Sequence, residues 1–257
     1  MAQKNIKLLI EYDGTAYAGW QVQKNLNSVQ GELIKAIESV TRRRVTLIGA
    51  GRTDAGVHAL GQVANFVVDH DLEPVRFKDA INFYLPSDIR IRESSEAAAD
   101  FDARRDARWK RYRYLVGLQK SAVYRQLRWD VTYPLSVEKL KRAAQEIVGE
   151  HDFSPFCVVS SRKKNNNCNI YNARWRQVGK LLVFEIRGNR FLHNMVRSLV
   201  GAMVNLACEN PDKNKLNLTL DRFADIIKAP SEARATFTAP PQGLYLVSVN
   251  YEKGTGI

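Results

Sequence analysis

Cysteine is scarce in this 257-residue sequence, and its three copies have neither metal-ligand nor redox spacing: Cys157, Cys168 and Cys208. An odd count without a CxxC pair argues against a disulfide framework and indicates reduced thiols in a cytosolic compartment. The four histidines form no HExxH or related cluster, so we expect no zinc site and no other bound metal.

Long apolar runs and linkers are missing as well. No stretch approaches the roughly 20 residues of a membrane span, and residues 1–11 lack the apolar core of a signal peptide. No Pro-, Gly- or Ser-rich segment has the length of a disordered linker. With 45% hydrophobic residues the chain can bury a sizeable core. We therefore expect a compact cytoplasmic protein without membrane association, built as one large domain or two packed smaller ones.

Acidic residues are in deficit. Lysine and arginine number 39 against 27 aspartates and glutamates, which gives a net charge of +12. Such a surplus favours polyanions, because each neutralised phosphate releases condensed counterions. A cationic surface also aids solubility, so charge alone favours a nucleic-acid partner only modestly.

Strand and helix patterns interleave irregularly along the chain. Apolar periodicity, turn residues and caps predict strands over residues 6–12, 45–49, 62–68, 88–93, 108–118, 174–178, 181–187 and 244–251. They predict helices over 28–41, 74–84, 136–148 and 191–208, and one more after Thr219. Hairpin signals rather than strict βαβ alternation favour the α+β class. A break near Arg104 gives two similar α+β halves, 1–104 and 105–257.

The most informative segment is a glycine-rich loop after a predicted strand, within residues 49–62. Arg52, Thr53 and Asp54 lie in this loop beside three glycines, which permit close approach of a bulky ligand. A dinucleotide fingerprint fails here, because Asp54 occupies the third glycine position and its charge would face a pyrophosphate. On the residues alone, two roles for Asp54 are equally supported: catalysis and capping of the following turn.

Two further segments place positively charged residues beside aromatic or apolar ones. On a strand over 108–118, alternation places Arg108, Lys110 and Tyr112 on one side, and cations interleaved with aromatics suit RNA. More commonly, however, aromatic residues on such a strand pack against a neighbouring helix.

In the predicted helix 191–208, Arg197 falls in the second turn among apolar residues, where a guanidinium needs a carboxylate or phosphate partner. An ordinary salt bridge to a surface acid is the simpler alternative.

The order of these motifs resembles the tRNA pseudouridine synthase A family, over about residues 6–251. The resemblance is carried by Tyr12-Asp13-Gly14, Gly19-Trp20-Gln21, residues 49–62, residues 110–114, residues 191–197 and residues 243–246. It implies two α+β halves that form one extended, mostly antiparallel sheet flanked by helices, and a homodimer without cofactor. It also implies isomerisation of uridine to pseudouridine in the anticodon stem-loop of tRNA, at positions 38 to 40.

The same resemblance assigns roles to individual residues. It implies that Asp54 is the essential aspartate, that the adjacent Arg52 helps to displace the target nucleotide, and that Arg197 pairs with the aspartate. Tyr112 is expected to contact the target base and Leu244 to form an apolar wall of the pocket. RNA contacts are expected from Arg108, Lys110 and Arg111.

Two other functions compete with this one. A noncatalytic tRNA-binding or tRNA-folding protein on the same scaffold would not need Asp54, so an Asp54→Ala protein that binds tRNA but makes no pseudouridine separates the two roles. A glycosidase would release free uracil, which an isomerase does not.

Overall fold

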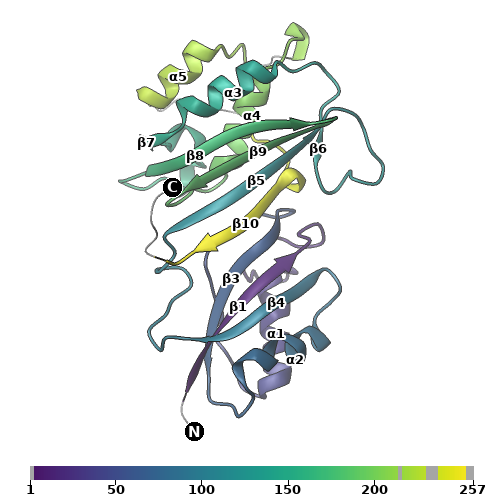
Figure 1. Cartoon of the computed structure of the whole chain (residues 1–257), viewed down its shortest axis with the longest axis vertical. Coiled ribbons are helices and arrows are strands. Elements are labelled where there is room, and N and C mark those ends of the chain that lie inside the picture. The colour runs from purple at the N-terminus through teal and green to yellow at the C-terminus, as the bar shows by residue number, and fades with distance from the viewer. Residues whose placement is uncertain (1–2, 214–215, 230–236, 253–257) are drawn as a thin grey trace. The chain divides into compact units, whose positions relative to one another are not determined.

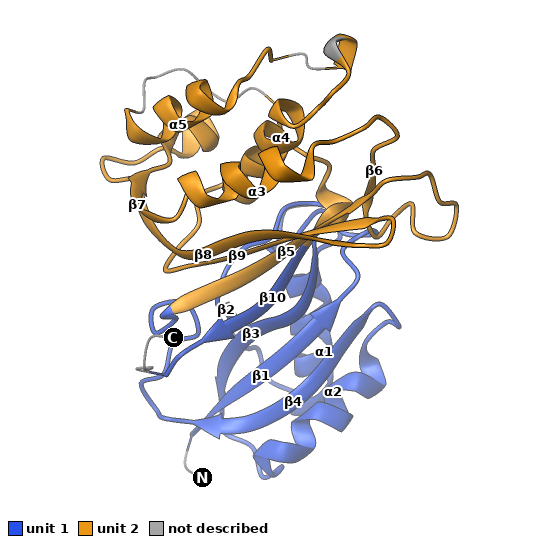
Figure 2. Ribbon diagram, turned by 45° about the horizontal axis from the view of Figure 1, so that its top comes forward, with its two compact units in different colours: residues 1–108, 245–257 blue, residues 109–244 orange. Residues whose placement is uncertain are grey.

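The computed structural model describes residues 3–213, 216–229 and 237–252 (Figure 1). Two compact units make up the chain (Figure 2). The first contains residues 1–108 and 245–257, and the second contains residues 109–244. The chain therefore crosses between the units twice, once after Arg108 and once before Tyr245. The functional halves 1–104 and 105–257 remain a prediction.

The first unit is a twisted sheet with strand order β4-β1-β3-β10, to which β2 is added along β3. The strands are β1 (Lys4–Tyr12), β2 (Ile48–Gly49), β3 (His58–Val68), β4 (Ile89–Ala97) and β10 (Leu244–Asn250). All pair antiparallel except β10, which runs parallel to β3 with Tyr245 opposite His58. Burial alternates along β1, where Ile6, Leu8 and Ile10 are fully buried, as a sheet with one covered face requires.

The first unit also contains two helices, α1 and α2 (Figure 2). Helix α1 spans Val29–Thr41, and the side chain of Ser28 caps it by accepting a hydrogen bond from the Gly31 N–H. Helix α2 spans Phe77–Tyr84 and follows a single 3₁₀ turn, Pro74–Arg76. Its residues Phe77 and Ile81, four apart on one helix face, are fully buried, so α2 docks through one apolar stripe.

The second unit is an antiparallel sheet of order β5-β9-β8-β7, with β6 paired parallel to β5. Its strands are β5 (Trp109–Gly117), β6 (Trp129–Asp130), β7 (Gly149–Asp152), β8 (Asn167–Val178) and β9 (Leu181–Gly188). Helices α3 (Val137–Glu146), α4 (Met195–Leu206) and α5 (Leu220–Lys228) lie on the same side of this sheet (Figure 2). Trp175 on β8 donates its indole N–H to the Met203 sulfur on α4, 3.4 Å away, which ties helix and sheet together.

The α+β class and the mostly antiparallel pairing are confirmed. Helix 191–208 was predicted too long, because α4 begins only at Met195, after Asn194 with its left-handed φ of 63°. The predicted strand 45–49 is reduced to β2, and the short strands β6 and β7 were not predicted. In the part of the chain that the structure describes, no helix has both the length and the apolar character to cross a membrane.

Candidate active site

Asp54 lies in the loop that joins β2 to β3, as the sequence predicted. Asp54 is half-buried, the preceding Thr53 is buried with 8% of its surface exposed, and Arg52 is exposed. The Asp54 carbonyl accepts a hydrogen bond from the Val57 N–H at 3.1 Å, so the main chain closes a turn directly after the aspartate. The turn thus places a half-buried aspartate directly after a buried threonine.

Backbone contacts to β3 fix the first part of the loop. The Ala50 N–H donates to the Val63 carbonyl at 2.8 Å. The fully buried Gln62 donates its side-chain amide to the Gly51 carbonyl, also at 2.8 Å. Because Gln62 and Val63 belong to β3, the start of the loop is anchored to the strand that follows it, and the Gly51 carbonyl has a partner within the protein.

Two more distant segments of the first unit hold Thr53. The Trp20 N–H donates to the Thr53 carbonyl at 3.0 Å, and the hydroxyls of Tyr12 and Thr53 are 2.7 Å apart. Burial raises the pKa of Tyr12, against the opposing effect of hydrogen bonds to Thr53 and Gln62, so this phenol is neutral. The residue before Asp54 is thus fixed through both its side chain and its main chain.

Tyr112 is placed on β5 in the second unit, opposite Ile186 of β9. It is 7% exposed and meets the Phe191 ring edge-on, with centroids 5.0 Å apart. The predicted alternation is seen for the tyrosines: Tyr112 and Tyr114 are buried, whereas Arg111 before them is exposed and Arg113 between them is half-buried. Lys110 is half-buried. The exposed Arg108 lies just before the strand and in the first unit, where its N–H donates to the Asn250 carbonyl at 2.8 Å.

Arg197 is the third residue of α4 and lies in its first turn, one turn earlier than predicted. Its side chain donates to the Ala239 carbonyl at 2.8 Å and to the Asn194 side-chain oxygen at 3.1 Å. The Ala239 N–H returns a hydrogen bond to the Arg197 carbonyl at 3.0 Å. The guanidinium therefore fixes the segment around Ala239 to the start of α4. Its pairing with Asp54 remains a prediction.

Leu244 begins β10 and is 6% exposed. The segment before it is fixed to β5, because Tyr114 donates its hydroxyl to the Pro240 carbonyl at 2.7 Å. A side chain at Gly243 would come within 2.5 Å of the Tyr114 ring, so this glycine allows the close approach. Burial raises the pKa of Tyr114, and the nearby charge of Arg197 lowers it by less. Tyr114 and Arg197 thus both hold the segment that precedes Leu244, through Pro240 and Ala239.

A charged cluster on β5, β8 and β9 was not predicted from the sequence. Glu185, only 4% exposed, binds the guanidinium groups of Arg113 and Arg174 at 2.8 Å and that of Arg176 at 3.0 Å. Burial acts to raise the pKa of Glu185, but the hydrogen bonds from Arg113 and Arg174 and the neighbouring positive charges lower it to about 2. The cluster leaves an excess of positive charge on this face of the sheet.

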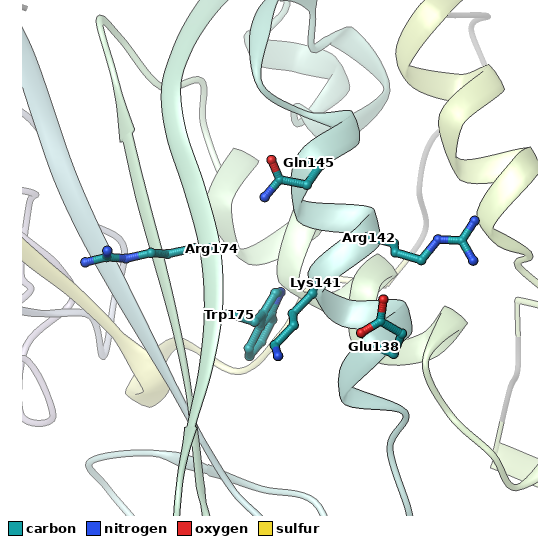
Figure 3. Close-up of a pocket in the computed structure, with 6 residues that line it drawn as sticks. All are labelled: Glu138, Lys141, Arg142, Gln145, Arg174 and Trp175. Atoms are coloured by element: carbon teal, nitrogen blue, oxygen red, sulfur yellow. The ribbon is translucent and has the colours of Figure 1, made fainter. Parts of the chain in front are cut away.

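A cavity of about 330 Å³ lies between α3 and β8 (Figure 3). It is lined by Glu138, Lys141, Arg142, Gln145, Arg174 and Trp175. The Arg174 side chain extends away from α3 in Figure 3, toward the side of the strand that carries Glu185. None of the predicted site residues is among those that line this cavity.

The chain matches the family described as "tRNA pseudouridine synthase" over residues 8–106 and 143–252. The tRNA pseudouridine synthase A of Acetivibrio thermocellus is 44% identical over 250 residues, which cover 96% of this chain and 100% of that protein. The protein of the same name from Brachyspira hyodysenteriae is 42% identical over 247 residues, with 94% and 96% covered. That from Thermoanaerobacter sp. is 39% identical over 250 residues, with 96% and 100% covered. The matched residues include the Asp54 loop, Arg197 and Leu244, and the chain belongs to the tRNA pseudouridine synthase family.

Proposed function

We propose that this chain isomerises uridine to pseudouridine in tRNA, with Asp54 as the catalytic carboxylate. Family membership over nearly the whole chain carries the proposal. The loop that bears Asp54 supports it, because the aspartate is half-buried and its neighbour Thr53 is fixed from two sides. Pre-organised groups on a rigid support are what a catalytic site requires.

The reaction breaks the bond between N1 of uracil and C1′ of the ribose and joins the base again through C5. C5 loses its proton to solvent, and N1 takes up a proton in its place. A uridine stacked in an RNA helix is out of reach of a side chain, so the nucleotide has to be flipped out at a cost of about a few kcal/mol. Stacking of the freed base on Tyr112 and phosphate contacts by Arg108, Lys110 and Arg111 are the proposed compensation.

Asp54 acts in its ionised form, as a nucleophile or a base. A guanidinium beside a carboxylate favours that form and orients it, and Arg197 and Arg52 are the proposed partners. Leu244 is proposed as an apolar wall that keeps water from the detached uracil.

The substrate is proposed to be the anticodon stem-loop of tRNA, and the active form is proposed to be a cytoplasmic homodimer. Sedimentation of a monomer at assay concentration would contradict the homodimer.

Tritium release from tRNA labelled at C5 of uridine tests the proposal. The wild type is compared with Asp54→Asn, which keeps the shape of the side chain but removes its charge. Asp79→Asn is the matched control, because Asp79 lies on α2 of the same unit with 82% of its side chain exposed. Free uracil is measured in the same reactions.

Release by the wild type and by Asp79→Asn, but not by Asp54→Asn, is the expected result. Equal release by all three proteins would support the proposed activity but would show that the Asp54 carboxylate is not required for it. No release from competent, undermodified tRNA by any protein would refute the proposed activity and favour a tRNA-binding role. Free uracil that still carries the C5 tritium, without release of tritium into water, would indicate a glycosidase.

A further inference from the structure

Two short motifs of the first unit lie outside the Asp54 loop, and the proposed chemistry gives them no role. Tyr12-Asp13-Gly14 begins with the last residue of β1, and Gly19-Trp20 precedes α1. Both contact the loop that carries Asp54, at positions on either side of the aspartate. Their contacts therefore bear on how the carboxylate is held.

The contact before Asp54 is a buried pair of hydroxyl groups. Tyr12 is 3% exposed, Thr53 is 8% exposed, and their oxygens are 2.7 Å apart. A buried hydroxyl that loses its partner costs free energy, so the pair holds Thr53 in one orientation. Only two soft backbone torsions, ψ of Thr53 and φ of Asp54, lie between the side chains of these neighbouring residues, so a rotation of Thr53 re-aims the aspartate.

The same residue is fixed through its main chain. Trp20 donates its N–H to the Thr53 carbonyl at 3.0 Å. Gly19 adopts φ +97°, and a Cβ there would lie 2.6 Å from the Thr53 oxygen and 3.1 Å from the carbonyl carbon of Asp54. Any other residue at position 19 would be strained and would push the loop away.

The contact after Asp54 involves Gly14. Its N–H donates to Nδ1 of His58 at 3.1 Å, where β3 begins. A side chain at Gly14 would overlap the Val57 carbonyl. Val57 is the residue that closes the turn on the Asp54 carbonyl. The backbone on both sides of the aspartate is thus in contact with a segment about 40 residues earlier in the chain.

We propose that Tyr12 and Thr53 are positioning residues for Asp54, and that their hydroxyl pair sets the direction of its carboxylate. The proposal rests on the proposed function, because the carboxylate is assumed to act on a flipped uridine. Neither residue is assigned a contact with RNA. Loss of the pair is expected to slow the chemical step and to leave tRNA binding unchanged.

The test measures single-turnover pseudouridine formation, the dissociation constant for tRNA and the melting temperature for each variant. Tyr12→Phe removes one hydroxyl and keeps the ring. Tyr17→Phe is the matched control, since Tyr17 is also buried in the first unit and donates its hydroxyl to Asp88 at 2.6 Å, in contacts that do not include the Asp54 loop. Thr53→Val removes the other hydroxyl, Thr53→Ser keeps it, and Tyr12→Phe with Thr53→Val removes both.

Tyr12→Phe is expected to lower the single-turnover rate by about 10- to 100-fold, because a misplacement near 1 Å costs up to about 100-fold. Its tRNA dissociation constant is expected to stay within about 2-fold of wild type, as is the rate of Tyr17→Phe. Thr53→Ser is expected to keep most of the rate that Thr53→Val loses. The double variant is expected to be no slower than the slower single variant, because the two hydroxyls act as one unit.

Equal rates for Tyr12→Phe and wild type would overturn the proposal. So would rate losses in both Tyr12→Phe and Tyr17→Phe that parallel the decreases in their melting temperatures. If Tyr12→Phe melts below the assay temperature, the comparison of Thr53→Val with Thr53→Ser decides, and equal rates there would overturn it. An inactive wild type would refute the proposed function itself, whereas an active wild type with unaffected variants would refute only the positioning role.

Discussion

Replacement of Glu185 by glutamine is predicted to destabilise the second unit in a way that depends on pH. The carboxylate is almost fully buried and accepts hydrogen bonds from three arginine side chains. Its pKa in the folded protein is about 2, against an ordinary value of 4.5. Because the folded pKa is the lower one, the ionised carboxylate stabilises the folded state above pH 4.5, and the stabilisation is lost as the pH falls toward 2.

The size of the effect follows from the two pKa values. Their difference corresponds to about 3 kcal/mol at pH 7, at ~1.36 kcal/mol for each pKa unit. Arg174 and Arg176 are about half exposed, so solvent screens their share, and we expect about 2 kcal/mol. At pH 3 the same linkage leaves under about half of the value at pH 7.

Urea unfolding followed by circular dichroism measures this effect at pH 7, 4 and 3. Glu209→Gln is the control, because Glu209 is an exposed glutamate of the same unit. The free-energy difference between Glu185→Gln and wild type is expected to be largest at pH 7 and to shrink toward pH 3, while the control stays near zero. Equal stabilities at pH 7, or a difference that does not change down to pH 3, would refute the linkage argument.

Three further substitutions test local features of the fold. Gly19→Ala places a Cβ within 2.6 Å of the Thr53 carbonyl at a positive φ, and is expected to cost about 1–3 kcal/mol in urea unfolding and to lower the rate of pseudouridine formation. Tyr114→Phe removes the hydrogen bond to Pro240 and is expected to cost about 1 kcal/mol, measured as a lower urea midpoint. Ser28→Ala removes the N-cap of α1 and is expected to cost about 1 kcal/mol by the same assay, with unchanged kinetics.

Elements with strong local signals could be predicted from the sequence. Helix α1 has a capping serine followed by apolar residues at helical spacing, and its observed span Val29–Thr41 agrees with the prediction. Helix α4 shows the limit, because Phe191 and Leu192 continue its apolar period, yet Asn194 adopts a left-handed conformation and the helix starts after it. Periodicity describes which residues face the core and does not fix the backbone of a single asparagine.

The site could be predicted only in part, for a related reason. The Asp54 loop is local in sequence, and its glycines and polar residues mark it. The Tyr12–Thr53 hydroxyl pair joins residues 41 positions apart and depends on the register of β1 against β3. The arginines around Glu185 come from β5 and β8 and converge on β9 only once three strands are paired. Contacts set by strand register leave no trace in a local pattern.

Two glycines of this unit have a use that the sequence analysis did not predict. The loop glycines were interpreted as room for a ligand. Gly14 and Gly19, which lie outside the loop, instead bring two other segments into direct contact with its main chain. Such contacts between backbones leave little freedom to the residue they enclose, and a carboxylate that must meet a flipped base gains from that restriction because it needs no reorganisation during the reaction. Under the proposed function, a change at either glycine is therefore expected to alter the aim of the Asp54 carboxylate without a change in its charge.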